Sequence, residues 1–317
     1  MSTEIQAVEK VEILTLQDNY IDLVAQDNSE VVQRAFPSEN GRLCHSIRAE
    51  HGFSAFITVT ENGKSRSILF DFGFSKDGAA SNAAALHVDL SAAEVLVLSH
   101  GHLDHLGGLV KLVERGRLQN LNLVLHPGAF VAPRIHKIDD TEKEIIPSFS
   151  HELADEAGVN LIQSKEPYPL LDGACLFLGE IPRTTPFEKG APNMFYLENG
   201  VEKQDPFLDD TGIAFHVKGK GLVVLTGCAH SGIVNTVTYA RKITGITDIM
   251  TIMGGFHLSG ADFETVISPT VAGLKALHPQ YIVPTHCTGR DAVMHVEKEM
   301  PDAFLLNMAG TQLTFAA

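Results

Sequence analysis

Residues 95–108 read VLVLSHGHLDHLGG, an apolar run followed directly by a cluster of histidines and glycines. The apolar run predicts a buried strand over 95–99, and the residues from about 106 to 115 predict a helix. Between them stand four potential metal ligands within six positions, namely His100, His102, Asp104 and His105. Gly107 and Gly108 let the backbone approach a neighbouring element closely. The stretch therefore predicts a metal site at the C-terminal end of a strand.

The spacing of the four ligands divides them into two pairs. His100 and His102 point to the same side of an extended chain, because side-chain direction repeats every two residues, so they can share one ion. Asp104 and His105 follow where the chain turns and can face a second ion, leaving room for a water or hydroxide between the two. We expect this arrangement to hold one or two metal ions.

Three further apolar runs also lead into histidines. They are GLVVLTGCA before His230, MTIMGGFHL with His257, and YIVPTHCTG with His286. Any one of these histidines could be an ordinary buried residue. Histidines with no common role would not repeatedly stand directly after a strand and beside Gly, Ser or Cys. We expect the remaining ligands to come from these strand ends, where Cys228 is a further candidate.

Strand and helix patterns alternate in both halves of the chain. Strands are expected over 11–16, 54–60, 66–72, 95–99, 123–126, 212–217, 221–226, 249–253, 281–284, 303–306 and 311–315. Between 127 and about 200 repeated prolines interrupt the pattern, and we expect an inserted cap there. The sequence predicts a single α/β domain over 1–317, with two sheets packed face to face and helices outside them.

Composition limits the partners of this protein. Its 317 residues carry 24 Lys+Arg against 39 Asp+Glu, a net charge of −15, so no global basic field exists to hold nucleic acid. No apolar run approaches the roughly 20 residues of a membrane helix, and the acidic start lacks the basic region of a secretory signal. The four cysteines show no CxxC pairing. We expect a cytoplasmic protein that binds neither nucleic acid nor membrane, with its oligomeric state left open.

The run from His100 to His105, with Gly107 and Gly108 behind it, resembles the His-x-His-x-Asp-His motif of the metallo-β-lactamase fold hydrolases. The resemblance implies a four-layer αββα sandwich with a metal centre at the mouth between the sheets. The implied ligands are His100, His102 and His230 for one ion, and Asp104, His105 and His286 for a second. Zinc is the expected metal, as one or two ions, with manganese or iron as alternatives.

Cys228 departs from this family pattern, because relatives commonly carry a bridging Asp at its position. A thiolate is a good zinc ligand at about 2.3 Å, so Cys228 can coordinate one ion. Alternatively Cys228 bridges the two ions only weakly, and His230 or Asp210 supplies the missing ligand. Metal binding is therefore more firmly expected than binding of two ions.

Other segments resemble one subgroup of the superfamily, that of 7,8-dihydropterin-6-methyl-4-(β-D-ribofuranosyl)aminobenzene-5'-phosphate synthase. These segments cover residues 179–183, 209–210, 226–235, 254–258 and 286–289. The resemblance implies a pterin-precursor synthase that uses the same metal site, and we keep this activity as the alternative to a hydrolase.

The activity predicted first is metal-dependent hydrolysis of a small molecule. Zinc lowers the pKa of a bound water to about 7, so hydroxide is available for attack on an ester, lactone or phosphodiester. Asp104 would orient that water, and His257 would donate a proton or contact the oxyanion. Arg183 can pair with a substrate phosphate or carboxylate, or else is a surface residue paired with Glu180.

The sequence argues against three classes of protein other than a metal-dependent hydrolase, or leaves them to experiment. A serine hydrolase would need a GxSxG motif and a P-loop enzyme a GxxxxGK[ST] motif, and the sequence contains neither. A non-catalytic sensor or redox binder would need iron in place of zinc. Elemental analysis of protein purified without added metal separates that last possibility from a zinc hydrolase.

Overall fold

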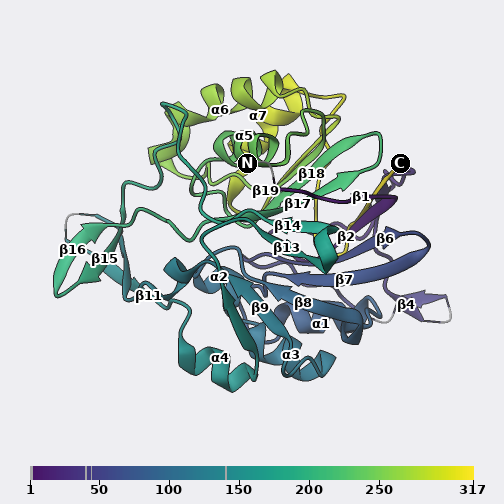
Figure 1. Cartoon of the computed structure of the whole chain (residues 1–317), viewed down its shortest axis with the longest axis horizontal. Coiled ribbons are helices and arrows are strands. Elements are labelled where there is room, and N and C mark those ends of the chain that lie inside the picture. Colours follow the sequence, from purple (N-terminus) through teal and green to yellow (C-terminus); the bar gives the residue numbers. More distant parts are fainter. Residues whose placement is uncertain (1–2, 40, 44, 140) are drawn as a thin grey trace.

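Two large β-sheets lie face to face in the computed structural model, which describes residues 3–39, 41–43, 45–139 and 141–317. Helices α1, α3 and α4 cover the outer face of one sheet, and α5, α6 and α7 cover the outer face of the other (Figure 1). This arrangement confirms the predicted αββα sandwich.

The first sheet comes mainly from the N-terminal half. Among the described residues its strand order is β12-β9-β8-β7-β6-β2-β21-β3. Its strands are β2 (Lys10–Gln17), β3 (Val32–Gln33), β6 (Ser54–Glu61), β7 (Lys64–Phe70), β8 (Ala93–Val97), β9 (Asn122–Leu125), β12 (Asn160–Gln163) and β21 (Gln312–Ala316). Strands β7, β8 and β9 are parallel, so their C-terminal ends meet at one edge of the sheet.

The second sheet has the order β13-β14-β17-β18-β19-β20 in the described part of the chain, with β1 paired to β17. Its strands are β1 (Ala7–Val8), β13 (Tyr168–Leu170), β14 (Cys175–Phe177), β17 (Gly212–Val217), β18 (Gly221–Thr226), β19 (Ile249–Gly255) and β20 (Tyr281–Thr285). Strands β18, β19 and β20 are parallel. In open α/β sheets such C-terminal strand ends are where ligands bind.

The helices pack through apolar faces onto these sheets. They are α1 (Gly78–Ala85), α2 (Leu103–Leu106), α3 (Leu109–Gly116), α4 (His151–Ala157), α5 (Ile233–Thr244), α6 (Glu264–Ala276) and α7 (Arg290–Glu299). The helix predicted over 106–115 is divided in the structure. It breaks at Gly107 and Gly108, where a side chain would collide with the carbonyl oxygens of Phe74 and Phe72. Asp104 and His105 consequently lie on the separate turn α2.

Apolar side chains from both sheets fill the space between them. Ile57, Phe70 and Val97 of the first sheet and Phe215 and Val223 of the second are fully buried there. Burial of large apolar side chains is worth roughly 1.5–3 kcal/mol each, so this layer holds the two sheets together. It therefore fixes the position of one set of strand ends relative to the other.

The cap expected over 127–200 has different limits in the structure. Strand β12 pairs in parallel with β9, β14 pairs with β17, and α4 packs on the first sheet, so these elements belong to the sandwich. The part outside the sandwich is a third sheet, which protrudes at the left of Figure 1. Its strands are β10 (Arg134–Lys137), β11 (Lys143–Ile146), β15 (Met194–Glu198) and β16 (Val201–Gln204). Because β9 and β12 are far apart in the sequence, the local pattern of residues does not predict that they pair.

The strand predicted over 303–306 is reduced to one bridge between Ile282 and Phe304. Strands β4 (Ser38–Glu39) and β5 (Arg42–Leu43) form a separate antiparallel pair.

Across the described ranges, no helix has both the length and the apolar character that crossing a membrane requires.

Candidate metal centre

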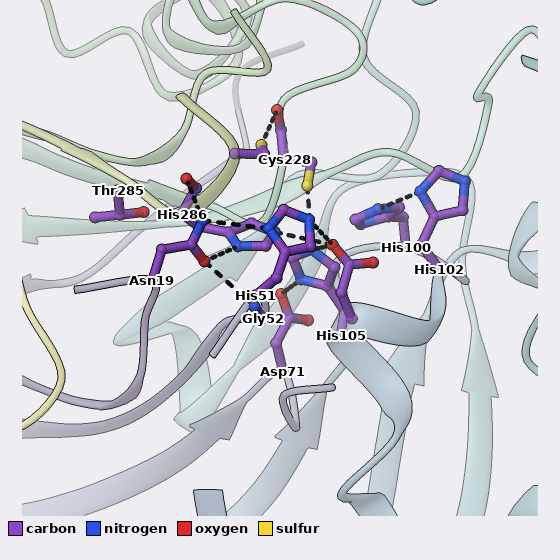
Figure 2. Close-up of polar contacts among 12 residues, drawn as sticks. Asn19, His51, Gly52, Asp71, His100, His102, His105, Cys228, Thr285 and His286 are labelled. Carbon is purple, nitrogen blue, oxygen red and sulfur yellow. Dashed lines mark hydrogen bonds and ion pairs between the residues drawn. The ribbon is translucent and has the colours of Figure 1, made fainter. Parts of the chain in front are cut away.

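The predicted ligands gather where the strand ends of the two sheets face each other. His100 and His102 follow β8, His230 follows β18, and His286 follows β20. Figure 2 shows His105, Cys228 and His286 directed toward one centre, with His100 and His102 beside them. The site is thus assembled from segments far apart in the sequence.

His100, His102 and His230 form a three-histidine group. The ring centroid of His100 lies 4.6 Å from that of His102 and 4.9 Å from that of His230, and the centroids of His102 and His230 are 4.8 Å apart. Nε2 of His102 and both ring nitrogens of His230 are buried without a hydrogen-bond partner in the described part of the chain. Because buried polar atoms are nearly always hydrogen-bonded, these nitrogens are available as ligands.

Burial sets the protonation of this group. It lowers the pKa of His102 to about 3, with the positive charge of Arg134 adding to the effect. Burial also lowers the pKa values of His100 and His230 well below the usual range, helped by the neighbouring imidazoles. All three rings are therefore neutral at pH 7, which is the form in which histidine binds a metal.

The second group, here called the mixed group, consists of Asp104, His105, Cys228 and His286. Their ligand atoms all lie within 4.8 Å of one another. Oδ2 of Asp104 is 3.0 Å from Nε2 of His286 and 3.5 Å from Nε2 of His105. Nε2 of His105 is 3.1 Å from Sγ of Cys228. Oxygen, nitrogen and sulfur ligands in one cluster suit zinc.

Asp104 and His105 have opposite charges in this cluster. Burial alone would raise the pKa of Asp104, but His105 and His286 lower it well below its usual range. Burial alone would lower the pKa of His105, but Asp104 and Asp71 raise it to about 10. A metal ion at His105 must therefore displace a proton from the ring.

Asp71, which no motif in the sequence singles out, contacts His105 of the mixed group. It follows β7 and is fully buried, and its Oδ2 lies 2.7 Å from Nδ1 of His105. The same carboxylate accepts hydrogen bonds from the backbone N–H and the hydroxyl of Ser99. A carboxylate at Nδ1 fixes the ring so that Nε2 faces the metal. The available signal was its position at the end of a strand beside β8.

Cys228 is common to three clusters of potential ligands. It belongs to the mixed group, it lies with His100 and His230 in a second cluster, and it lies with His257 and Cys287 in a third. Burial raises the pKa of the Cys228 thiol. For Cys287 burial acts in the same direction, but a hydrogen bond with Cys228 and the charges of His286 and His257 lower its pKa. The structure thus brings Cys228 between the mixed group and the pair His100 and His230, where a bridging ligand would be expected, whereas His102 belongs to none of these clusters.

The backbone is strained at several of these strand ends. The φ angles of Asp71, Ala229, His257 and His286 are 54°, 50°, 47° and 47°, in the left-handed region that residues with side chains rarely adopt. Such conformations persist only where the surrounding structure holds them, and they cluster at functional sites. The strained positions support the assignment of a functional site to this edge of the sheets.

Two cavities open beside the metal ligands. The larger one, of about 530 Å³, is lined by Asp104 and Cys228, and β11 and β15 of the third sheet contribute Ile145 and Met194 to its wall. The smaller one, of about 430 Å³, has a mainly apolar wall that includes Phe256. Both cavities are lined by His230, His257 and Phe263, so these three side chains belong to the walls of both.

His257 has the position expected of a residue that contacts substrate. Its ring centroid is 4.1 Å from that of His230, and its Nδ1 has no hydrogen-bond partner among the described residues. His51, which follows no apolar run in the sequence, also lines the larger cavity, with Nε2 3.6 Å from Oδ2 of Asp104. Its polar surroundings in the sequence gave no signal of this proximity.

The structure does not bring Arg183 or Asp210 to the metal ligands. Arg183 is exposed, donates a hydrogen bond of 2.8 Å to the carbonyl oxygen of Pro206, and lines neither of the two cavities. Asp210 accepts a 2.8 Å hydrogen bond from the backbone N–H of Ser231 and belongs to none of the ligand clusters found among the described residues. Burial raises the pKa of Asp210 to about 6. Cys228, and not Asp210, occupies the place between the two groups.

A buried ion-pair network supports the loop that carries His100 and His102. Arg134 is fully buried, and its guanidinium donates to Asp205 at 2.8 Å and to Asp209 at 2.6 Å. The other oxygen of Asp209 accepts a 2.8 Å hydrogen bond from the backbone N–H of Gly101. Nothing in the sequence around Arg134 distinguishes it from a surface arginine, so its place in this network was not predicted.

Comparison with known proteins places this fold and site in one family. The model of the metallo-β-lactamase superfamily matches residues 49–127, which include the histidine motif. The chain is 32% identical over 273 residues to 7,8-dihydropterin-6-methyl-4-(beta-D-ribofuranosyl)-aminobenzene-5'-phosphate synthase of Methanocaldococcus jannaschii, covering 84% of this chain and 90% of that protein. It therefore belongs to the metallo-β-lactamase superfamily, in the group that contains this synthase, and it is an enzyme.

Other similar proteins agree with this placement. An uncharacterized protein of the same organism, MJ0448, is 31% identical over 249 residues, covering 77% of this chain and 86% of its own. The crystal structure of Tm1679 is described as that of a metal-dependent hydrolase of the β-lactamase superfamily. It matches this chain with a TM-score of 0.72 at 26% identity, and the match covers 97% of this chain and 100% of the Tm1679 chain. The metallo-β-lactamase fold protein YhfI of Bacillus subtilis shares the fold, with a TM-score of 0.51 at 11% identity over 97% of this chain and 100% of its own.

Proposed function

We propose that this enzyme is a metal-dependent hydrolase that cleaves an ester, lactone or phosphodiester bond in a small molecule. The observation that supports it most is that Cys228 clusters both with His100 and His230 and with the mixed group, on the wall of a cavity. This geometry allows one or two ions beside a bound substrate. Zinc is the proposed metal, with manganese or iron as alternatives.

The residues of the site fit a metal. The unpartnered nitrogens of His102 and His230 are buried, and burying such atoms without a partner costs free energy that a bound ion would recover. The neutral state of these rings and the carboxylate state of Asp104 are those of metal ligands. When bound, the ions would lower the pKa of a water molecule and polarise the substrate oxygen.

Two side chains are proposed to handle the proton and the water. Asp104 lies on the wall of the larger cavity and is ionised, so one of its oxygens can accept a hydrogen bond from the attacking water and orient it. The side chain of His257 lines both cavities, and its buried Nδ1 has no hydrogen-bond partner among the described residues. We assign His257 the delivery of a proton to the leaving oxygen or contact with the developing negative charge.

A synthase activity is the second candidate, and two observations favour it. The M. jannaschii relative is named as a dihydropterin–ribofuranosylaminobenzene phosphate synthase, and the chain covers 90% of its length. The smaller cavity adds room beside the larger one, and His257 belongs to the walls of both. Two adjacent cavities can hold two reactants at once, which a condensation requires and a hydrolysis does not.

One experiment separates these activities. The zinc-loaded chain is incubated with a panel of lactone, thioester, ester and phosphodiester substrates, and in a second assay the product named for the relative is sought by mass spectrometry. Hydrolysis that is lost with Asp104→Asn and that proceeds without a second organic reactant supports the hydrolase. Formation of the pterin product without hydrolysis of any panel member would replace the hydrolase with the synthase.

A further inference from the structure

The thiols of Cys228 and Cys287 face each other in the third ligand cluster. Their Sγ atoms lie within 4.8 Å of one another, and Sγ of Cys287 donates a hydrogen bond of 3.7 Å to the carbonyl oxygen of Cys228. Neither cysteine is in a disulfide. The metal ligands proposed above include Cys228 but not Cys287, so the second thiol has no role in the proposed chemistry.

The two cysteines meet because the strand between them ends in glycine. Cys228 follows β18 and Cys287 follows β20, while β19 lies between these strands in the sheet. A Cβ atom built on Gly255, at the end of β19, would lie 2.6 Å from Sγ of Cys287 and 3.2 Å from Cα of Cys228. Neighbouring strands are about 4.8 Å apart, so thiols two strands apart normally do not meet. Any side chain at position 255 would fill the space that they share.

A small oxidant can reach this pair of thiols. Cys228 and Cys287 are 2% and 7% exposed, and both line the larger cavity. Cys175 is also a free thiol, but it is 0% exposed and packs in the apolar layer between the sheets. Reactivity of a cysteine requires access, which the cavity provides for the pair and the core denies to Cys175.

We propose that Cys228 and Cys287 are a reversible oxidation site, in which a peroxide converts the two thiols into a disulfide. The thiolate of Cys287, the more exposed of the two, attacks hydrogen peroxide, and the O–O bond breaks to leave a sulfenic acid and hydroxide, which takes up the proton released from the Cys287 thiol and becomes one water. The thiol of Cys228 then attacks that sulfur. An S–S bond forms, the S–O bond breaks, and the oxygen leaves as a second water. Peroxide thus accepts the two electrons that the thiols lose, and a dithiol reductant returns them.

Formation of this disulfide would remove Cys228 from the metal centre, a consequence that rests on the proposed metal-dependent function. The sulfur of a disulfide is no longer a thiolate, and the thiolate is the form that binds zinc. The position that Cys228 shares between the mixed group and the cluster with His100 and His230 would lose its ligand. Peroxide would therefore lower metal occupancy, and a bound ion at Cys228 would slow the oxidation.

The test uses the full chain, freed of metal with a chelator or loaded with zinc, and treated with hydrogen peroxide. Non-reducing digestion and mass spectrometry then identify the peptides that contain Cys228 and Cys287. We expect a cross-linked peptide pair that lacks two hydrogens and is separated by dithiothreitol. Cys175→Ala should form the same cross-link, whereas Cys287→Ser should not. Thermal unfolding of each variant shows that the variant is folded.

The outcomes distinguish this proposal from the proposed function. Cross-linking in the metal-free chain that zinc slows, with release of about one equivalent of zinc per cross-link, supports both. Cross-linking that zinc does not slow supports the oxidation site and contradicts the role of Cys228 as a ligand. If the folded, metal-free chain keeps both thiols, or gives only sulfinic acids without a cross-link, the oxidation site is wrong.

Discussion

Asp71 and Cys228 contact the two ring nitrogens of His105. Oδ2 of Asp71 lies 2.7 Å from Nδ1, and Sγ of Cys228 lies 3.1 Å from Nε2. The two interactions lie on opposite sides of the imidazole. The carboxylate therefore determines which nitrogen carries the proton and which can face an ion. Both residues are fully buried, so the orientation of the ring is fixed before any ligand binds.

Replacement of Asp71 by Asn tests this orientation. Asn tolerates the positive φ at this position, so the fold should be kept, but the negative charge at Nδ1 is lost. We expect the affinity of the mixed group for zinc to fall by about 10- to 100-fold. Competition with a chromophoric chelator measures this affinity. Asp77→Asn, at an exposed position whose side chain makes no capping hydrogen bond, is the matched control. Equal affinities of Asp71→Asn and the parent would show that the contact is only structural.

Removal of Arg134 should destabilise the whole domain. Arg134→Ala leaves Asp205 and Asp209 buried without their partner, which typically costs about 3–5 kcal/mol. Urea unfolding measures the loss. The exposed Arg115, replaced by Ala, should change stability by no more than about 0.5 kcal/mol. If both variants unfold at the urea concentration of the parent, the network does not contribute to stability.

Asp104→Asn keeps the size of the side chain and removes its charge. We expect metal to remain bound in part, because the other ligands are unchanged, and turnover to fall by at least about 100-fold. Steady-state kinetics on whichever substrate the panel identifies measures this loss. Asp155→Asn, on the exposed surface of α4, should behave as the parent. Near-normal turnover of Asp104→Asn would assign Asp104 a structural role only.

Cys228 is tested by cobalt substitution. If its thiolate is a ligand, the cobalt-loaded parent shows a thiolate-to-cobalt charge-transfer band that Cys228→Ser lacks. The serine variant should also bind zinc at least about 10-fold more weakly, whereas Cys228→Asp should preserve or improve binding of two ions by supplying a carboxylate. Cys175→Ala serves as the control thiol. Identical cobalt spectra of the parent and Cys228→Ser would rule out coordination.

The sequence predicted much of this site because its chemistry is local. Each ligand follows an apolar strand, and parallel strands place such ends at one edge, which brought His100, His230 and His286 together as expected. Their individual roles in metal binding stay predictions. The fold class followed from the same alternation of strands and helices.

The missed features depend on contacts between distant segments. Asp71 is one acidic residue after a strand, and its role appears only when β7 lies beside β8. Arg134 acquires its importance from burial between Asp205 and Asp209, which no local pattern encodes. The limits of the cap were wrong for the same reason, because β12 joins the first sheet through pairing with a distant strand.

The metal content of the purified chain shows whether the histidines that follow β8 bind an ion. The full chain, purified without added metal and then loaded with zinc and desalted, is compared by elemental mass spectrometry with His100→Ala/His102→Ala and with the control His216→Ala/His295→Ala. We predict that the parent and the control hold the same one or two equivalents, and that His100→Ala/His102→Ala holds about one fewer and has no turnover. A parent that holds no zinc, manganese or iron, or a double variant with unchanged metal content and turnover, would contradict the account.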